Sequence, residues 1–378
     1  MATTKDVIQH IRDEDNDAYS DDSLFNIKPW GADLSFRELI QRYDDDELVK
    51  PELQRKYVWD RAEASRFIDS LLLGLPVPSI FLAQTQDEKL LIIDGYQRIM
   101  TVYDYVNGIF SRDGKSFSLS RSEKINSRWR GKNFLELSDT EQRRVRNTTI
   151  HAIIFAQQQP SQDDTSLFQV FERINTSGRT LLSQEIRNCV AQGNFNSLLF
   201  SLNDYGPWRA LFGLNEPDAR MRDMEFILRF YALTSEAYRT DTREKISLRR
   251  FLDLYMKANA NIPQNQIDEM RQRFISAIDL VMSSFGGNAF HNVSPTDSTR
   301  FVPKFSPTIF DSTLIAADYA LRVGGITPPQ NPGEARRELL LDPEYRLAIS
   351  QETMKRDSIY KRISMACQHL FGINYEQP

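Results

Sequence analysis

KLLIIDGYQRIMTVYDYVN, residues 89–107, combines a short apolar run, a turn that contains one glycine and an amphipathic segment. The apolar run at 90–93 is typical of a buried strand. After the turn, apolar residues recur at helical spacing, and the pattern stops at Asn107 and Gly108, which favour the end of a helix. The sequence therefore predicts a strand that passes directly into a helix.

The turn itself, Asp94-Gly95-Tyr96-Gln97-Arg98, brings a carboxylate, a glycine, an amide and a guanidinium to that junction. Backbone N–H groups at the start of a helix attract anions, and a guanidinium can bind a phosphate through two hydrogen bonds. The pattern predicts an anion site, with Asp94 available to bind magnesium or to orient water. The alternative is a structural turn in which Asp94 caps the helix and Arg98 pairs with a nearby acid.

The flanking residues predict the elements that support this turn. Asp60 and Glu63 have the spacing of a capping box, and an apolar helical pattern follows them. Two apolar runs, 79–83 and 90–93, are separated by a polar turn and are expected to pair as in a hairpin. Residues 147–156 are β-branched and apolar, which predicts a further buried strand.

Four motifs occur in a fixed order between residues 30 and 190. They are Gln54-Arg55 with Tyr57-Val58-Trp59, the helix end Leu75-Pro76-Val77-Pro78, the turn at 94–98, and FERINTSG at 171–178. This combination resembles the N-terminal domain of GmrSD-type restriction proteins, a member of the ParB and sulfiredoxin-like superfamily. The family usually has Asp-Gly-Gln-Gln-Arg in the turn, and Tyr96 replaces the first glutamine here. That departure favours nucleotide binding over hydrolysis.

The resemblance implies an α+β fold, with a small mixed sheet in a ParB/sulfiredoxin-like domain. It also implies a nucleoside triphosphate site at the turn, coupled to DNA recognition in restriction and anti-phage defence. Catalytic roles would fall on Asp94, Gln97 and Arg98, and a magnesium ion would bind at Asp94. The other implied nucleotide-binding residues are Gln54, Arg55, Gly95, Tyr96, Arg173, Asn175 and Arg179, with Glu172 and Glu185 in second place.

Several of these residues also have a structural interpretation. Arg55 can lie on an edge strand with its aliphatic stem over Trp59, and Trp59 itself is expected in the core rather than as a platform for a base. Residues 176–178 can be a connection between helices that is locked by polar side chains. Glu185 is either a general base or a salt-bridge partner.

Residues 112–146 are the one stretch in which basic side chains clearly outnumber acidic ones. Such a stretch is a candidate contact for DNA phosphates. The candidate residues are Arg128, Arg130, Lys132, Arg143 and Arg144. The interleaved Phe117, Trp129 and Phe134 either stack on bases or, as is commoner, pack the segment onto the protein.

The pattern of the chain predicts three parts. Residues 13–22 carry six carboxylates and no basic side chain, so residues 1–29 are expected to form an acidic flexible arm. Residues 30–192 contain the ParB-like motifs. From residue 193 to residue 378, apolar residues recur at intervals of three and four, which predicts an all-α domain.

Composition restricts the class of protein. The net charge of -5 indicates that any nucleic-acid surface is local. No apolar signal core is visible at the N-terminus, and no run approaches the roughly 18 apolar residues that span a bilayer, so a cytoplasmic protein without a membrane partner is expected. Cys189 and Cys367 lack metal-ligand spacing and are expected in the core. The four histidines are scattered, so no HNH nuclease is expected in this polypeptide, and His151 is expected as a satisfied core residue.

Three functions remain open from the sequence. The first is a protein that binds a nucleoside triphosphate, with or without hydrolysis, and acts on or senses DNA in defence; a nuclease or defence-system partner chain and a homo-oligomer are compatible with it. The second is a metal-dependent ParB-like DNA nuclease with Asp94, Glu172 or Glu185 as metal ligands. The third is a non-catalytic regulator that binds DNA or a partner.

Overall fold

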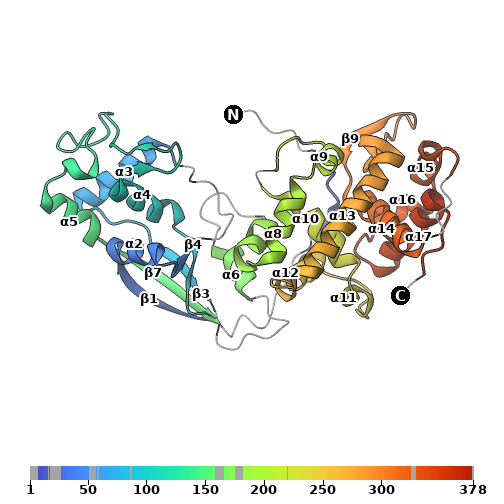
Figure 1. Cartoon of the computed structure of the whole chain (residues 1–378), viewed down its shortest axis with the longest axis horizontal. Helices are drawn as coiled ribbons and strands as arrows, with labels where there is room; N and C mark the ends of the chain where they lie inside the picture. The colour runs from blue at the N-terminus through green and yellow to red at the C-terminus, as the bar shows by residue number, and fades with distance from the viewer. Residues whose placement is uncertain are drawn as a thin grey trace. The chain divides into compact units, whose positions relative to one another are not determined.

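A computed structural model describes most of the chain and resolves it into two compact units (Figure 1). The described residues are 7–15, 17, 27–50, 57, 59–85, 87–157, 166–174, 182–218, 220–324 and 329–376. The sheet unit comprises Asp21–Leu181 and Asn188–Val190, and the helical unit comprises Met1–Ser20, Leu182–Arg187 and Ala191–Pro378. The helical unit is therefore assembled from both sides of the sheet unit in sequence, whereas the sequence predicted consecutive parts that divide after residues 29 and 192.

The sheet unit contains a five-stranded mixed sheet in the order β1-β7-β3-β4-β2. Its strands are β1 (Ile27–Ser35), β2 (Leu48–Val49), β3 (Ile80–Gln84), β4 (Leu90–Asp94) and β7 (Thr149–Gln157). The pairs β1/β7 and β3/β4 are antiparallel, and β3/β7 and β2/β4 are parallel. The expected hairpin and the strand at 147–156 are confirmed, and so is the α+β class with a small mixed sheet. The strand β1 was not predicted.

Helices cover this sheet and form the core with it. They are α2 (Phe36–Asp44), α3 (Arg61–Leu73), α4 (Tyr96–Asn107), the short η2 (Phe134–Glu136) and α5 (Asp139–Asn147), with the two-stranded ribbon β5 (Ile109–Phe110) and β6 (Lys115–Ser116), and α6 (Ser166–Ile174) follows the sheet. The predicted capping box starts α3, because the Asp60 carboxylate accepts from the Glu63 amide and the Glu63 carboxylate accepts from the Asp60 amide. Ile68, Ile92 and Ile99 are fully buried where α3, β4 and α4 meet in this core.

The helical unit is mainly α-helical, as predicted, with one short hairpin. Its elements are α1 (Arg12–Asp15), α7 (Ser183–Val190, whose last three residues fall in the sheet unit), α8 (Asn194–Asn203), α9 (Gly206–Phe212), α10 (Arg222–Leu233), α11 (Glu236–Arg239), α12 (Leu248–Ala258), α13 (Gln264–Phe285), η3 (Gly286–Asn288), β8 (His291–Val293), β9 (Phe301–Phe305), α14 (Pro307–Val323), α15 (Pro332–Leu341), α16 (Pro343–Ser350) and α17 (Arg356–Phe371). Helix α14 is buried along most of its length and packs against α10, α13 and α17. Within the described residues, no helix combines the length and apolar character needed to cross a membrane.

The N-terminal segment, residues 7–17, is bound to the helical unit in its described part. The Gln9 amide donates to the Phe305 carbonyl at 2.7 Å, the Phe305 amide donates to the Val7 carbonyl at 2.7 Å, and Ile11 is buried. The Asp13 carboxylate accepts from the Thr353 amide at 3.3 Å. An acidic arm was expected to have solvated side chains. In these residues the carboxylates instead accept hydrogen bonds from donors in the helical unit.

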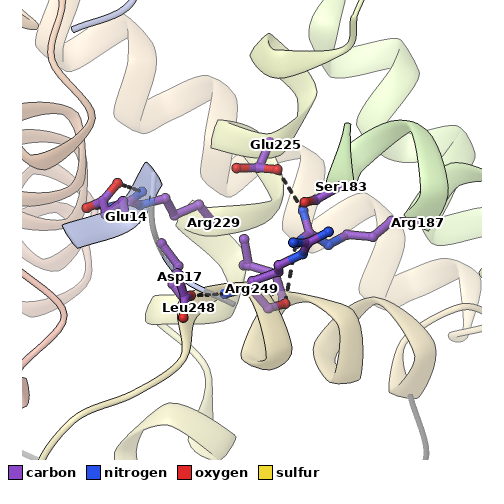
Figure 2. A pocket seen from close by; sticks show the side chains of 9 residues that line it. Glu14, Asp17, Ser183, Arg187, Glu225, Arg229, Leu248 and Arg249 are labelled. Atoms are coloured by element: carbon purple, nitrogen blue, oxygen red, sulfur yellow. Dashed lines mark hydrogen bonds and ion pairs between the residues drawn. The ribbon is translucent and has the colours of Figure 1, made fainter. Parts of the chain in front are cut away.

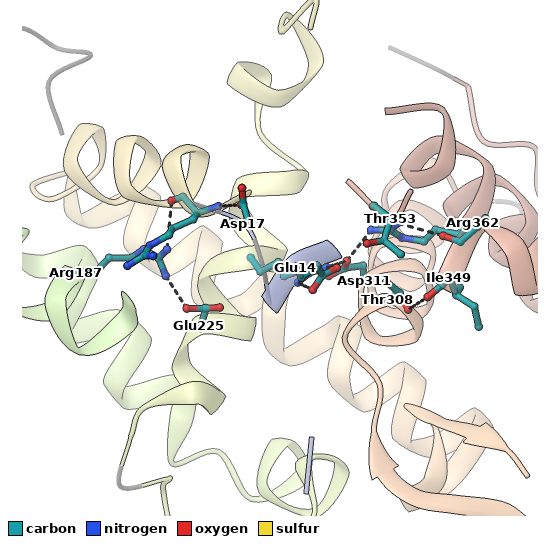
Figure 3. Close-up of polar contacts among 12 residues, drawn as sticks. Glu14, Asp17, Arg187, Glu225, Thr308, Asp311, Ile349, Thr353 and Arg362 are labelled. Carbon is teal, nitrogen blue, oxygen red and sulfur yellow. Dashed lines mark hydrogen bonds and ion pairs between the residues drawn. The ribbon is translucent and has the colours of Figure 1, made fainter. Parts of the chain in front are cut away.

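The strongest of these contacts is made by Glu14 (Figure 3). Both of its carboxylate oxygens accept from Arg229, at 2.7 and 2.8 Å, and the Arg229 side chain is only 3% exposed. Asp311 accepts from Arg229 on its other side, and it also accepts from Arg362 at 3.0 Å. Burial by itself would raise the pKa of Glu14, but the charge and hydrogen bonds of Arg229, with the charge of Arg362, outweigh burial and lower it.

We expect Glu14→Gln to destabilise the helical unit by roughly 2 kcal/mol, because Arg229 loses a charged partner in a buried place. Urea denaturation followed by circular dichroism measures this change. Glu38→Gln is the matched control, since Glu38 pairs with Arg42 on the exposed side of α2 and should contribute less than about 0.5 kcal/mol. Equal effects of the two substitutions would contradict the prediction.

The stability supplied by Glu14 should also depend on pH. Because its folded pKa lies below the ordinary 4.5, the contribution is complete above the unfolded pKa and is lost as pH falls through the folded value. The difference in unfolding free energy between the wild type and Glu14→Gln should therefore be constant from about pH 7 to pH 5 and shrink in more acidic solution. Parallel stability curves down to about pH 3 would show that Glu14 titrates as an ordinary carboxyl group.

Candidate functional site

The junction between β4 and α4 depends on the backbone of Gly95. This residue has φ +103°, in the left-handed region, and a Cβ placed on it would lie 2.3 Å from Cγ2 of Ile80 on β3. Only glycine combines that backbone conformation with so close an approach. The strand thus passes into the helix within one residue, and Asp94 and Arg98 lie on either side of the junction.

Arg98 pairs with Asp94 across the turn. Its Nη2 donates to Asp94 Oδ2 at 2.7 Å and to the Ser79 carbonyl at 3.1 Å. The Arg98 side chain is 15% exposed and that of Asp94 is 41% exposed. The Arg98 Nε atom is buried without a hydrogen-bond partner in the described structure. The guanidinium is thus held in place, while its paired carboxylate stays open to solvent.

The structural alternative for this turn is correct in one part and wrong in another. Arg98 does pair with an acid, and that acid is Asp94. Asp94 does not cap the helix, because Gly95 is the N-cap residue and α4 has no side-chain cap. The first amides of α4 therefore remain available to an anion as far as side-chain caps are concerned.

Gln97 is oriented by residues from another part of the sheet unit. Its Oε1 accepts from the Trp59 amide at 3.3 Å, and its carbonyl accepts from the Thr101 hydroxyl at 2.6 Å. The Tyr57 hydroxyl lies 2.6 Å from Thr101 Oγ1, and burial raises the pKa of Tyr57 far above its usual value. Tyr57 and Thr101 are supports that the sequence analysis did not identify. The spacing of four residues between Gln97 and Thr101 is the one local indication of this contact.

Tyr96, where the resemblance led us to expect a glutamine, has a partly buried ring. The ring packs against the hydrophobic core of the sheet unit. Burial raises the pKa of Tyr96 to about 12, with smaller contributions from Tyr43 and Asp104. The phenol is consequently neutral at physiological pH and can donate a hydrogen bond, but it does not offer the amide carbonyl and amide nitrogen of glutamine.

An open hollow of about 310 Å³ lies on the surface of α3. It is lined by Trp59, Glu63, Arg66, Phe67 and Ser70. The Trp59 ring meets Phe67 edge to face, with centroids 5.6 Å apart. Trp59 thus packs partly in the core, as predicted, and partly forms the wall of the hollow. Its backbone amide also contacts Gln97.

The other predicted nucleotide-binding residues are only partly described. Gln54, Arg55, Asn175 and Arg179 lie outside the described residues. On α6, Arg173 is exposed and Glu172 is half-buried. These positions stay predictions.

Glu185 belongs to the helical unit and makes structural contacts there. Its Oε2 accepts from the Leu182 amide at 2.7 Å, at the start of α7, and from Arg220 Nε at 2.8 Å. Of the two roles considered for Glu185, the structure shows the salt-bridge partner. The contact with Leu182 also satisfies one of the amides at the N-terminus of the helix.

Several candidate DNA contacts in the basic stretch are used within the protein. Arg128 pairs with Glu141 at 2.6 Å. Arg130 donates to the Ile125 carbonyl, and Arg144 donates to the Leu72 carbonyl at 2.8 Å. Lys132 is half-buried and Arg143 is exposed. Guanidinium groups that are already bonded to backbone or acid have fewer donors left for a phosphate.

The aromatic residues of this stretch are core residues. Phe117, Trp129 and Phe134 are almost fully buried, and Trp129 Nε1 donates to Asp69 at 2.6 Å. Stacking of these rings on bases is therefore wrong as an expectation, and the alternative of aromatics that pack the segment down is confirmed.

Two further expectations have clear outcomes. His151 is not a core residue: its side chain is 52% exposed on β7, where Nδ1 lies 2.9 Å from Asp33 of β1. The strand β1 was missed, so this cross-strand pair could not be foreseen. Cys189 and Cys367 are both buried, as predicted. Among the described residues, no group of three or more histidine, cysteine or acidic side chains is placed to hold a metal ion.

Comparison with known protein families identifies part of the chain. Residues 36–191 match the model of the GmrSD restriction endonuclease N-terminal domain. No curated protein and no solved structure matches the chain. The matched range begins with α2 and includes the turn at 94–98.

We expect Gly95→Ala to destabilise the sheet unit by about 3 kcal/mol or more, since it adds backbone strain and a clash with Ile80. Gly108→Ala is the matched control at the other end of α4: it also has positive φ, +79°, but its Cβ would meet nothing within 4 Å, so it should cost only about 1 kcal/mol. Thermal denaturation of both variants measures the difference. Similar losses in the two proteins would show that close packing at Gly95 does not matter.

Proposed function

Residues 36–191 belong to the GmrSD restriction endonuclease N-terminal domain family, and from that premise we propose that the protein binds a nucleoside triphosphate at the turn of residues 94–98. The family match supports a role in restriction and defence. The triphosphate is the ligand that the turn supports best, and the protein acts on or senses DNA in the cytoplasm. A nuclease or other defence-system chain is the partner class that fits such a role, and a second copy of this chain is compatible with it.

One observation carries the proposal: a helix N-terminus without a side-chain cap lies between Arg98 and an accessible Asp94. The amides of α4 and the guanidinium attract phosphate oxygens. The ion pair between Arg98 and Asp94 then acts as a placeholder, because a phosphate competes with the Asp94 carboxylate for the same guanidinium.

Asp94 fits as a ligand for magnesium that arrives with the triphosphate. Magnesium in nucleotide sites is usually held by one or two carboxylates together with phosphates and water, so a single accessible aspartate is sufficient from the protein. When bound, the ion neutralises charge on the phosphate oxygens. Asp94 would exchange its contact with Arg98 for this role.

Binding is better supported than hydrolysis. Tyr96 replaces a glutamine and packs its ring against the core, and the Gln97 side chain accepts from the Trp59 amide. These contacts commit the Tyr96 ring to the core and Gln97 Oε1 to the Trp59 amide. A nucleotide-dependent regulator without turnover is therefore the second candidate function, and the hollow beside Trp59 offers room for the base of the nucleotide.

We expect calorimetry to show triphosphate binding that Arg98→Ala weakens about tenfold or more, because a charge-assisted contact is lost. ATP and GTP should be titrated separately, with and without magnesium. Arg42→Ala, which removes a half-buried guanidinium of α2, should bind as the wild type does. Circular dichroism must show that Arg98→Ala remains folded, since Arg98 also contacts Ser79.

Asp94→Asn separates the two roles of Asp94. Without magnesium it should bind triphosphate more tightly than the wild type, because the competing carboxylate charge is gone. Addition of magnesium should raise the triphosphate affinity of Asp94→Asn less than it raises that of the wild type. Failure of both nucleotides to bind the wild type would rule out the proposal, and magnesium-dependent nicking of plasmid DNA that Asp94→Asn abolishes would favour a nuclease instead.

A further inference from the structure

The helical unit contains a polar cavity of about 140 Å³ (Figure 2). Side chains reach it from α7, α10 and α12 and from the N-terminal segment. They include Glu14, Asp17, Ser183, Arg187, Arg229 and Arg249. Arg187 and Arg229 are almost completely buried, so the wall of the cavity includes two guanidinium groups inside the protein.

Arg187 is saturated by the helical unit itself. Its guanidinium donates to Asp253 at 2.6 Å, to Glu225 at 2.8 Å and to Gln184 at 3.2 Å. These three acceptors come from α12, α10 and α7. Arg187 therefore fixes the wall of the cavity and is not available as a ligand.

Arg229 depends instead on the N-terminal segment for half of its contacts. Asp311 accepts from its Nε and Nη2, and Glu14 accepts from its Nη1 and Nη2. The contact with Glu14 is bidentate, with each carboxylate oxygen on a different nitrogen. Two oxygens of a phosphate fit the same fork of donors.

Asp17 occupies a second anion position in the same cavity. Its Oδ2 accepts from the Arg249 amide at 2.8 Å, and Arg249 is the second residue of α12. An amide at this place on a helix is a common donor to phosphate. The segment thus puts one carboxylate on a buried arginine and another on a helix N-terminus.

The carboxylates do not satisfy every donor near Glu14. Arg362 Nε and Thr353 Oγ1 are buried and have no hydrogen-bond partner in the described structure. Both residues are about 1% exposed. Arg362 acts on Glu14 through its charge, and the Thr353 amide binds Asp13. Arg362 and Thr353 do not line the cavity, but they contact the same carboxylate cluster through Asp311 and Asp13.

We propose that this cavity is a phosphate-binding site and that Glu14 and Asp17 fill it as an internal ligand. The site consists of Arg229, Ser183 and the N-terminus of α12. A phosphate dianion carries about the charge of two carboxylates, so the exchange leaves the buried charge balance almost unchanged. Binding of phosphate displaces Asp13, Glu14 and Asp17 from their contacts in the helical unit. The site is separate from the turn at 94–98 and does not depend on the function proposed for it.

The test compares phosphate binding by the full chain and by the double variant Glu14→Gln/Asp17→Asn. Calorimetry with inorganic phosphate should show at least tenfold tighter binding by the double variant, because its internal competitors are neutral. Glu38→Gln/Asp45→Asn is the matched control: it removes two carboxylates from α2 and its C-cap, changes the net charge equally and should bind as the wild type does. A parallel titration with a nucleoside monophosphate distinguishes a site for free phosphate from one for a monoester.

Two further measurements decide the outcome. The tighter phosphate binding of the double variant must persist when Arg98→Ala is added to it. If Arg98→Ala abolished that increase in affinity, the phosphate would bind at the turn and the proposal would be overturned. In the wild type, saturating phosphate should speed hydrogen exchange at the Thr353 amide, because it loses Asp13 as its acceptor when the segment is displaced. This measurement decides alone if the double variant does not fold. Unchanged exchange at the Thr353 amide would overturn the proposal.

Discussion

The left-handed backbone of Gly95 is the constraint on which the candidate nucleotide site depends. Because β3 and β4 are adjacent, Ile80 lies where any larger residue at position 95 would place its Cβ. The glycine lets the chain start α4 immediately after β4, so that Asp94 and Arg98 face each other over an uncapped helix N-terminus. The chemistry of the turn follows from this geometry: an anion attracted by the helix must compete with a carboxylate that is already present.

The sequence predicted the local parts of this arrangement well. Apolar periodicity and the capping box of Asp60 and Glu63 place α3, and the apolar run before Gly95 places β4 and α4. The strand β1 escaped prediction because IKPWGADLS contains Pro29 and Gly31 and lacks a buried apolar face; only one of its residues is buried. Its register with β7 is what pairs Asp33 with the exposed His151.

The sites were hard to predict mainly because their residues contact partners that are far away in the sequence. The position of an arginine in the sequence does not reveal whether its guanidinium binds a ligand, a carbonyl or an acid. The guanidinium groups of Arg130 and Arg144 donate to carbonyls. Glu14 and Arg229 are 215 positions apart, so the segment that looked like a solvated arm gave no local sign of its partner. Both units nevertheless use one device: a carboxylate lies on an arginine beside a helix N-terminus, at Asp94 in the sheet unit and at Glu14 with Asp17 in the helical unit.

The discontinuity of the helical unit has a consequence during synthesis. Residues 7–15 leave the ribosome long before Arg229, Phe305 and Thr353, to which they bind, because these are made hundreds of residues later. The sheet unit, whose residues are nearly contiguous, can fold while the nascent acidic segment is still without its partners. The helical unit can close only after the segment around Thr353 has been made, so that this segment and residues 7–15 are present together.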